Sequence, residues 1–198
     1  MAGKFIVMEG LDGSGLSTQS RMLHEYLVSK KQDIILTKEQ TDGIIGGLIK
    51  SSLRNEWNTD ALALQMLFAA DRSHHLTVEI EPALKEGKIV ICDRYIFSTL
   101  AFGGLKADVE FLKTINSRFR KPDLTFIIDT EPETCLERIK ASRFGQELFE
   151  DLEKSTQVRE NYLALKDYFS NVHVIDGNRT KEKVFEDVKK IVDAVFKI

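Results

Sequence analysis

Residues 10–19, GLDGSGLSTQ, follow the glycine-rich pattern G-x-x-x-x-G-K-[ST] of loops that hold phosphate groups, except at one position. Gly10, Gly15 and Ser17 fit the pattern, but Leu16 stands where the lysine is expected. The glycines of such a loop permit a tight turn that aims backbone N–H groups at an anion, and the hydroxyl binds Mg²⁺. Leu16 cannot bond phosphate, so either another residue supplies the cation or the segment is a Gly/Ser turn that merely connects two elements.

A second group of candidates consists of charged residues that each close a short apolar run: Glu9, Lys38, Asp93, Asp129 and Asp176. In a parallel sheet, ligands bind beyond the carboxyl ends of the strands. If the apolar runs are strands, these side chains and the glycine loop meet at one edge of the sheet.

The apolar runs predict five strands, at residues 4–9, 33–38, 88–93, 124–129 and 172–177. Segments of helical periodicity separate them, at residues 17–29, 44–54, 60–80, 108–118, 132–141, 149–169 and 181–197. The runs lack alternation between apolar and polar residues, which is typical of a parallel sheet covered on both faces. The pattern predicts an α/β fold, a three-layer sandwich in which helices flank a five-stranded parallel sheet.

The composition is that of an ordinary globular protein, with 42% hydrophobic and 30% charged residues in a chain of 198. This length predicts a single domain over residues 1–198. The formal charge of −3 provides no basic field, so neither nucleic acid nor a membrane is expected as a partner. Two widely separated cysteines, and no apolar stretch of roughly 20 residues, favour a soluble protein of the reducing cytoplasm.

Two further motifs carry a resemblance to a known family. They are CDRYIFSTLAF at residues 92–102 and LFAADR at residues 67–72. Together with GLDGSG-ST, they resemble the motifs of thymidylate kinases, the P-loop enzymes that convert dTMP and ATP to dTDP and ADP. The similarity spans the whole chain, including KPDLTFIID at residues 121–129 and VIDGN at residues 174–178. It implies a P-loop NTPase fold with a lid, ATP and dTMP as substrates, Mg²⁺ as cofactor, and a homodimer.

The resemblance assigns the ATP phosphates to the glycine loop, residues 10–17, and to the residue after it. The residues that would hold them are Gly10, Asp12, Gly13, Ser14, Gly15, Leu16, Ser17 and Thr18. Ser17 and Asp93 would bind the metal, and Arg94 would grip the substrate phosphate. A metal and a cation are needed there to neutralise charge during phosphoryl transfer. Asp93 and Arg94 could instead form a buried ion pair that caps the strand.

For the base and sugar of dTMP, the resemblance points to four residues. Phe68 and Arg72 lie four positions apart, on one face of a helix, where similar kinases stack thymine on the ring and hydrogen-bond its carbonyl. Phe102 would crowd C2′ and disfavour ribose, and Ser98 would touch the base. The alternatives are a core phenylalanine beside a surface arginine, plain packing of Phe102, and a solvent-facing serine.

Asp12, Lys38 and Glu39 complete the dTMP site that the resemblance implies. Asp12 would contact the 3′-hydroxyl of the sugar, unless it only forms the turn through its own backbone. In KEQTDGIIGGLI, residues 38–49, Lys38 replaces a family arginine that holds the dTMP phosphate, and Glu39 keeps the family carboxylate. Lysine retains the charge of that arginine but loses its bidentate fork.

The family also carries a lid over ATP, which corresponds here to about residues 141–151. Arg143 would bring a catalytic charge from this lid, and it or Arg94 would partly cover the missing lysine. Asn178 and Arg179, just after the last strand, would pack near adenine. The alternatives are a solvated basic residue in the lid and ordinary surface residues after the strand.

The leading hypothesis is therefore a nucleoside monophosphate kinase that acts on dTMP with Mg·ATP, using Asp93, Arg94 and Arg143 to position and neutralise the phosphates. One alternative is a kinase of another deoxynucleotide or deoxynucleoside. Another is a catalytically weak or inactive nucleotide-binding protein, to which Leu16 and Lys38 point. Family homodimers form through helices on one side of the sheet, and the apolar segment ALALQMLFAA, residues 61–70, is compatible with such a contact.

Overall fold

The structure of the protein, a computed structural model, describes residues 3–142 and 152–197. These residues contain a sheet of five parallel strands in the order β2-β3-β1-β4-β5. The strands are β1 (Lys4–Gly10), β2 (Ile34–Lys38), β3 (Ile89–Asp93), β4 (Leu124–Asp129) and β5 (Val172–Asp176). The predicted strands are confirmed, and each end differs from the prediction by no more than one residue.

Helices connect the strands. They are α1 (Leu16–Ser29), α2 (Ile44–Leu53), α3 (Ala61–His75), α4 (Glu81–Lys85), α5 (Ile96–Ser98), α6 (Val109–Asn116), α7 (Pro132–Ser142), α8 (Leu152–Ala164) and α9 (Lys181–Phe196). Two π-helical turns complete the helical structure: η1 (Leu76–Ile80) joins α3 to α4, and η2 (Thr99–Gly103) continues α5.

The helices differ most from the predicted ranges in three places. The helix predicted over residues 60–80 continues to Lys85, because α3, η1 and α4 follow one another without a break. The helical segment of α5 and η2 was not predicted at all, since the short apolar run IFSTLAFG has no clear helical period. The helix predicted over residues 149–169 is α8, which ends at Ala164, before the predicted end, and residues 149–151 lie outside the described part of the chain.

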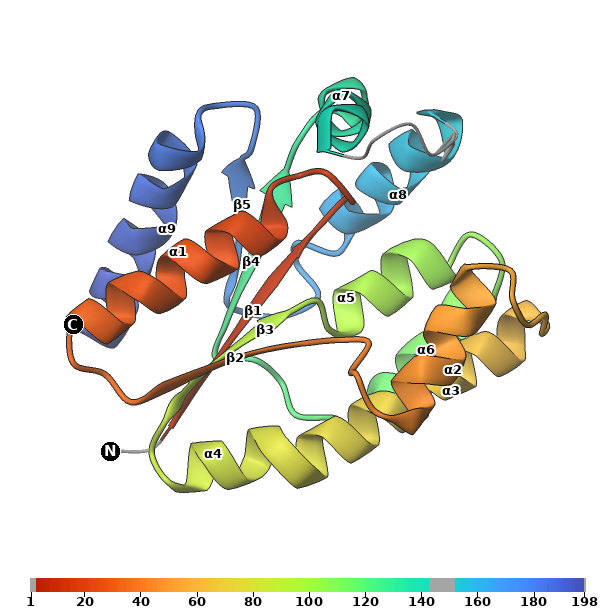
Figure 1. The fold of residues 1–198 in the computed structure, drawn as a ribbon, viewed down its shortest axis with the longest axis horizontal. Coiled ribbons are helices and arrows are strands. Elements are labelled where there is room, and N and C mark those ends of the chain that lie inside the picture. Colours follow the sequence, from red (N-terminus) through yellow and green to blue (C-terminus); the bar gives the residue numbers. More distant parts are fainter. Residues whose placement is uncertain (1–2, 143–151, 198) are drawn as a thin grey trace.

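The sheet lies between two layers of helices, which confirms the three-layer sandwich (Figure 1). α1 and α9 cover one face, while α3 to α6 and α8 lie on the other. The central strand β1 shows the division, because Ile6 and Met8 belong to the core beneath α1 and α9, whereas Phe5 and Val7 belong to the core on the opposite face. Burial of both faces explains why the strand runs are continuously apolar.

The charged residues at the ends of the strands lie together at the carboxyl edge of the sheet. In the middle of the sheet, Met8 pairs with Asp93 on one side and with Phe126 on the other. Lys38 is in register with Asp93. The loops that follow β1, β2, β3 and β4 therefore leave the sheet side by side, which is where a parallel sheet binds its ligands.

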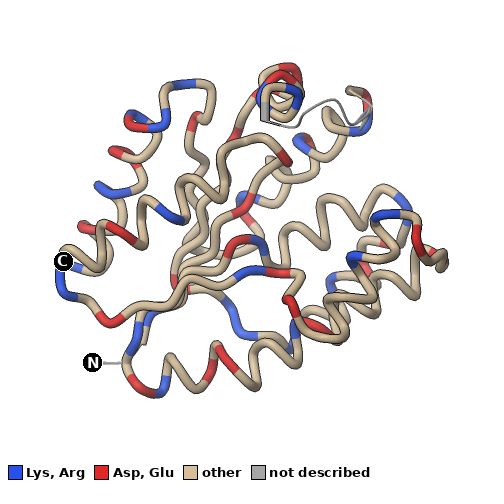
Figure 2. The backbone as a smooth tube through the Cα atoms, viewed as in Figure 1, with Lys and Arg blue, Asp and Glu red and all other residues tan. Residues whose placement is uncertain are grey.

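The charge distribution agrees with the small formal charge of −3. Figure 2 shows acidic and basic residues interspersed along the whole described backbone. Among the described residues, no helix has the length and hydropathy to cross a membrane.

Candidate active site

The glycine loop connects β1 to α1 and rests against α7 and the loop after β4. Gly13 has a φ of 81°, and a Cβ there would overlap the carbonyl oxygen of Cys135 in α7. The Ser14 carbonyl accepts hydrogen bonds from Thr130 Oγ1 at 3.2 Å and from Arg138 Nη1 at 3.3 Å. α1 begins directly after the turn. Its unpaired N–H groups and the positive end of its dipole therefore lie at the loop, an arrangement that binds anions.

Leu16 belongs to the hydrophobic core. Its side chain is 4% exposed and lies in the core cluster that also contains Ile6, Met8 and Leu23, between the sheet and α1. The next two residues, Ser17 and Thr18, are exposed. The loop thus keeps the backbone and the hydroxyl of a phosphate site, while a buried apolar side chain takes the position of the cation.

Arg94, directly after β3, joins the glycine loop to α5 and η2. Its Nη1 donates to the Gly10 carbonyl at 2.8 Å and to Ser98 Oγ at 3.2 Å. Its Nη2 donates to Asp12 Oδ1 at 2.6 Å. The guanidinium also lies 5.4 Å from the centre of the Phe102 ring. One charged group therefore contacts both the loop expected to hold ATP and the residues expected around dTMP.

Asp93 does not pair with Arg94, whose partner is Asp12. The half-buried Asp93 carboxylate forms neither a hydrogen bond nor an ion pair with any other residue that the structure describes. The alternative of an Asp93–Arg94 ion pair that caps the strand is therefore wrong.

Glu9, buried at the end of β1, accepts hydrogen bonds from three donors. They are Tyr95 N at 2.9 Å, Ser98 Oγ at 2.6 Å and the Tyr162 hydroxyl at 3.3 Å. Burial raises the pKa of the Glu9 carboxyl above its ordinary value of 4.5, although Ser98 and Arg94 act to lower it. Burial likewise raises the pKa of Tyr162 well above its usual range. Ser98 is part of this network, so the alternative of a solvent-facing serine is wrong.

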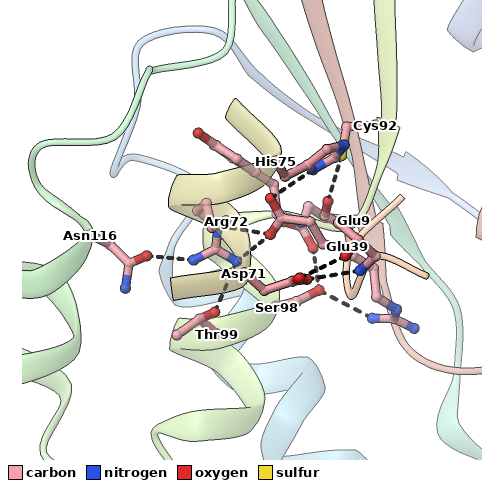
Figure 3. A network of polar contacts seen from close by, with 12 residues as sticks. Glu9, Glu39, Asp71, Arg72, His75, Cys92, Ser98, Thr99 and Asn116 are labelled. Carbon is pink, nitrogen blue, oxygen red and sulfur yellow. Dashed lines mark hydrogen bonds and ion pairs between the residues drawn. The ribbon is translucent and has the colours of Figure 1, made fainter. Parts of the chain in front are cut away.

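Arg72 is 1% exposed, and protein acceptors surround it (Figure 3). Its Nε donates to Glu39 at 2.8 Å, its Nη2 donates to Thr99 Oγ1 at 3.1 Å, and its Nη1 donates to Asn116 Oδ1. The guanidinium also lies over the Tyr95 ring, 4.9 Å from its centre. The alternative of a surface arginine is therefore wrong, and a contact of Arg72 with thymine stays a prediction.

Lys38 and Glu39 lie where β2 ends and the loop to α2 begins. The exposed Lys38 ammonium is 3.4 Å from Asp42 Oδ2, and Asp42 also accepts a hydrogen bond from Lys50. Hydrogen bonds from Lys50 and Lys38 hold the pKa of Asp42 below its usual range. The Glu39 N–H donates to the Asp93 carbonyl at 3.0 Å, which fastens this loop to the end of β3.

The structure brings most of the expected dTMP residues together in two adjoining groups. Asp12, Ser98 and Phe102 gather around Arg94, whereas Arg72 and Glu39 form a separate buried pair. Tyr95 adjoins both groups, because its N–H bonds Glu9 and its ring lies under Arg72. The half-buried Phe68 lies one turn before Arg72 in α3.

The two residues expected near adenine lie on the other side of the glycine loop. Asn178 Oδ1 accepts a hydrogen bond from Glu131 N at 2.9 Å, and Arg179 Nη2 donates to Asp187 at 2.6 Å. Arg138 links this region to the loop, because its Nη2 donates to the Gly177 carbonyl at 3.0 Å. Contacts of Asn178 and Arg179 with adenine stay predictions.

Arg143 and nearly all of the predicted lid, residues 143–151, lie outside the described residues. The helix that follows is fastened to the sheet. Arg159 in α8 donates to both carboxylate oxygens of Asp129, at 2.6 and 3.0 Å, and to Glu131 at 2.6 Å. Paired N–H donors of this kind fix orientation as well as distance.

The sequence prediction overlooked several residues that hold this site. Asp71 stands inside the LFAADR motif beside Arg72, and that position is the one signal that could have singled it out. Tyr162 carries no such signal, because its partner Ser98 is far away in the sequence. Buried polar contacts between residues that are far apart in the sequence can be identified only from the folded structure.

Glu39, His75 and Cys92 form a compact buried group whose potential metal-ligand atoms lie within 4.8 Å of one another. Two of the three groups already have partners within the protein. Arg72 pairs with the Glu39 carboxylate at 2.7 Å, and His75 Nε2 is 2.8 Å from Thr37 Oγ1. The geometry is that of a hydrogen-bonded cluster in the core.

Comparisons with known proteins agree with this geometry. The sequence profile of a family described as "Thymidylate kinase" matches residues 8–188. A "Probable thymidylate kinase" of Pyrococcus abyssi is 38% identical over 198 residues, which cover 97% of each chain. A "Thymidylate kinase" of Ruegeria pomeroyi is 38% identical over 201 residues, which cover 96% of this chain and 94% of the relative. A "Probable thymidylate kinase 1" of Saccharolobus solfataricus is 39% identical over 192 residues, which cover 96% of each chain.

Proposed function

The chain belongs to the thymidylate kinase family and is a nucleoside monophosphate kinase that phosphorylates dTMP, and we propose that ATP is its phosphoryl donor. The observation that carries this proposal is the position of Arg94. Its guanidinium contacts Gly10 and Asp12 in the glycine loop, and Ser98 and Phe102 on the other side. A fixed cation between donor and acceptor is what transfer of a charged phosphoryl group requires.

On the donor side, the backbone of the glycine loop and the N-terminus of α1 bind the phosphates of ATP. Leu16 contributes no charge because its side chain is apolar, and it is buried in the core. The cations that support this loop are Arg94, on the Gly10 carbonyl, and Arg138, on the Ser14 carbonyl. We assign to them, together with Arg143, part of the role of the missing lysine.

Mg²⁺ is the expected cofactor, and the residues present fit it. Ser17 is an exposed hydroxyl in the first turn of α1, and Asp93 is a half-buried carboxylate without a hydrogen-bonding partner among the described residues. Hydroxyl and carboxylate oxygens are the ligands that Mg²⁺ prefers. Bound there, the ion would neutralise charge on the transferring phosphate.

On the acceptor side, Phe68 stacks on thymine, and Phe102 stands against C2′ of the sugar. Lys38 and Arg94 bind the monophosphate, and Asp12 binds the 3′-hydroxyl. Arg72 and Ser98 recognise the base, and Glu39 holds Arg72 in place. These side chains act by positioning and by neutralising charge, without a covalent intermediate.

Release of ADP from Mg·ATP tests the assignment, with dTMP, dUMP, dCMP, dGMP, AMP and thymidine as separate acceptors. Turnover that is strongest with dTMP is the expected result. Preference for another acceptor would identify a kinase of a different deoxynucleotide or deoxynucleoside. Binding of ATP without turnover of any acceptor would contradict the proposal and identify an inactive nucleotide-binding protein.

We also propose that the protein is a homodimer whose interface includes α2 and α3. Several large apolar side chains of these helices and of the segment between them are exposed; they are Ile44, Leu48, Leu53, Trp57, Leu62 and Met66. Ile44 is the most exposed of them, at 87%. The two helices lie together at one end of the molecule (Figure 1). Sedimentation equilibrium of the protein and of Leu62→Glu tests this: a dimer that the substitution dissociates is expected, and a monomeric wild type would contradict it.

A further inference from the structure

A single acidic residue of α3 holds the loop between β2 and α2. Asp71 is 1% exposed, and both of its carboxylate oxygens are used by the same partner. Oδ2 accepts a hydrogen bond from Thr41 N at 2.8 Å, and Oδ1 accepts one from Thr41 Oγ1 at 2.6 Å. Hydrogen bonds to a charged acceptor are stronger than neutral ones, so this contact is a firm attachment of the loop to α3.

Thr41 in turn organises the loop around itself. Its Oγ1 accepts a hydrogen bond from Gly43 N at 3.2 Å, and its carbonyl accepts one from Lys50 Nζ at 2.8 Å. A Cβ on Gly46 would overlap the Thr41 carbonyl oxygen, so a glycine is required at this point of α2. Every polar atom of Thr41 is therefore used, and the loop is fixed against both α2 and α3.

The same loop carries the groups that surround Lys38. Asp42, directly after Thr41, lies 3.4 Å from the Lys38 ammonium. Glu39, two residues before Thr41, is held by Arg72, the neighbour of Asp71 in α3. Two successive residues of one helix thus fix the loop at two points, on either side of Gln40.

We propose that Asp71 is a positioning residue for the acceptor nucleotide, acting through Thr41. It holds residues 39–43 so that Lys38 and Glu39 keep the arrangement that receives the monophosphate. This inference rests on the proposed function, in which Lys38 binds the phosphate of dTMP. It predicts that loss of the attachment weakens acceptor binding and leaves ATP binding unchanged, because the hydrogen-bonding partners of Thr41 among the described residues are Asp71, Gly43 and Lys50, none of which belongs to the glycine loop.

Steady-state kinetics of three variants test the proposal. Asp71→Asn replaces an acceptor with a donor opposite Thr41 and is expected to raise KM for dTMP by about 10- to 100-fold, with kcat reduced less than about threefold. Thr41→Val removes only the hydroxyl and is expected to raise KM by about 3- to 10-fold. Thr41→Ser keeps both donors and is expected to restore KM to within about twofold of wild type.

Asp60→Ala is the matched control. Asp60 lies at the N-cap of the same helix and accepts a hydrogen bond from Ala63 N at 2.7 Å, so its removal destabilises α3 without touching the loop. We expect a lower Tm with an unchanged KM for dTMP. Calorimetric Kd values for a non-hydrolysable ATP analogue are expected to stay within about twofold of wild type in every variant, since none of the substitutions touches the glycine loop.

Amide hydrogen exchange of a peptide that covers residues 38–47, without any substrate, tests the attachment independently of activity. Faster exchange in Asp71→Asn and Thr41→Val, but not in Asp60→Ala, is expected. Unchanged exchange, or an unchanged KM for dTMP in both variants, overturns the proposal. If the wild-type protein neither binds nor phosphorylates dTMP, both the proposed function and the acceptor role of Asp71 are overturned. If the wild type is active and the variants keep its KM for dTMP, only the acceptor role of Asp71 is overturned.

Discussion

Buried charges that are hydrogen-bonded within the protein lie behind the part of the site that we assign to dTMP, whereas the part that we assign to ATP is built from backbone and surface pairs. Glu9, Asp71 and Arg72 are at most 1% exposed, and each forms at least two hydrogen bonds. Near the expected adenine position, Arg179 pairs with Asp187 while both side chains remain about one-third to one-half exposed. The two regions share one sheet edge but differ in how firmly their side chains are fixed.

The difference indicates that binding of dTMP depends more than binding of ATP on side chains that are already fixed before the substrate arrives. A buried charge costs several kcal/mol if it loses its partner, so the dTMP region holds one arrangement before any ligand arrives. Exposed pairs contribute little, with a median of about 0–1 kcal/mol, so residues of the ATP region can exchange partners when a nucleotide binds. Substitutions should therefore act strongly and specifically in the first region and weakly in the second.

The largest effect is expected for Arg94→Ala, which removes the group that joins the two regions. It deletes the hydrogen bonds to Gly10, Asp12 and Ser98 together with the contact on Phe102. A well-placed arginine contributes about 10³-fold or more to phosphoryl transfer, and we expect a fall in kcat/KM of that order. Initial rates with dTMP and Mg·ATP measure it.

Arg94→Lys is the control for charge alone. Lysine keeps the positive charge but lacks the planar fork through which two Arg94 nitrogens bond Gly10, Ser98 and Asp12, so an intermediate loss is expected. If Arg94→Ala lowered kcat/KM by less than about tenfold, phosphoryl transfer would not depend on Arg94. The claim that this arginine joins the ATP region to the dTMP region would then be wrong.

The next largest effect is expected for Leu16→Lys, which tests how the ATP region responds to an added charge. A lysine that leaves the core and reaches the phosphates adds charge-assisted hydrogen bonds, each worth roughly 1.5–3 kcal/mol. We therefore expect kcat/KM for ATP to rise by about 10- to 100-fold, with KM for dTMP unchanged. The core loses the buried Leu16, worth roughly 1.5–3 kcal/mol, so Tm falls by about 3–12 °C.

Leu16→Met is the matched variant, because it retains an apolar side chain of similar size and should change neither ATP kinetics nor Tm appreciably. Equal kinetics for Leu16→Lys and wild type would show that Arg94, Arg138 and Arg143 already supply the whole charge. A loss of activity in a folded Leu16→Lys protein would instead show that this loop has adapted to the leucine.

The sequence predicted the sheet better than the polar networks behind the site, and the reason is physical. Strands and the glycine loop depend on residue types within a few positions, as in residues 4–17. The partners of Glu9 are Tyr95, Ser98 and Tyr162, which only the fold brings together. Likewise, the burial of Leu16 depends on its place between the sheet and α1. Periodicity predicts which face is apolar, but not which buried polar atoms meet.

Glu9→Gln tests the buried charge of the dTMP region through the pH dependence of stability. Burial raises the pKa of the folded Glu9 carboxyl above its ordinary 4.5, so the folded state binds its proton more tightly than the unfolded state does. Stability due to this group is therefore greatest at low pH and falls as the pH rises from about 4.5 through the raised folded pKa. Glutamine does not titrate, so the free energy of unfolding of wild type minus that of Glu9→Gln should decline over this range.

Urea unfolding of both proteins at several pH values between about 4 and 8 measures this difference. Because both proteins share every other titrating group, their common pH dependence cancels. A difference that stays flat or increases with pH would mean that Glu9 is not held at a raised pKa, and that the dTMP region is less tightly buried than its contacts indicate.

The smallest effect is expected for Arg179→Ala, at the surface of the ATP region. Its guanidinium pairs with Asp187 at 2.6 Å and Asp176 at 3.3 Å, but solvent reaches all three side chains. An exposed pair of this kind contributes about 0–1 kcal/mol, so a change in KM for ATP of no more than about fivefold is expected, with kcat and KM for dTMP unchanged. An effect as large as that of Arg94→Ala would show that the ATP region also depends on one fixed side chain, and the contrast between the two regions would then be wrong.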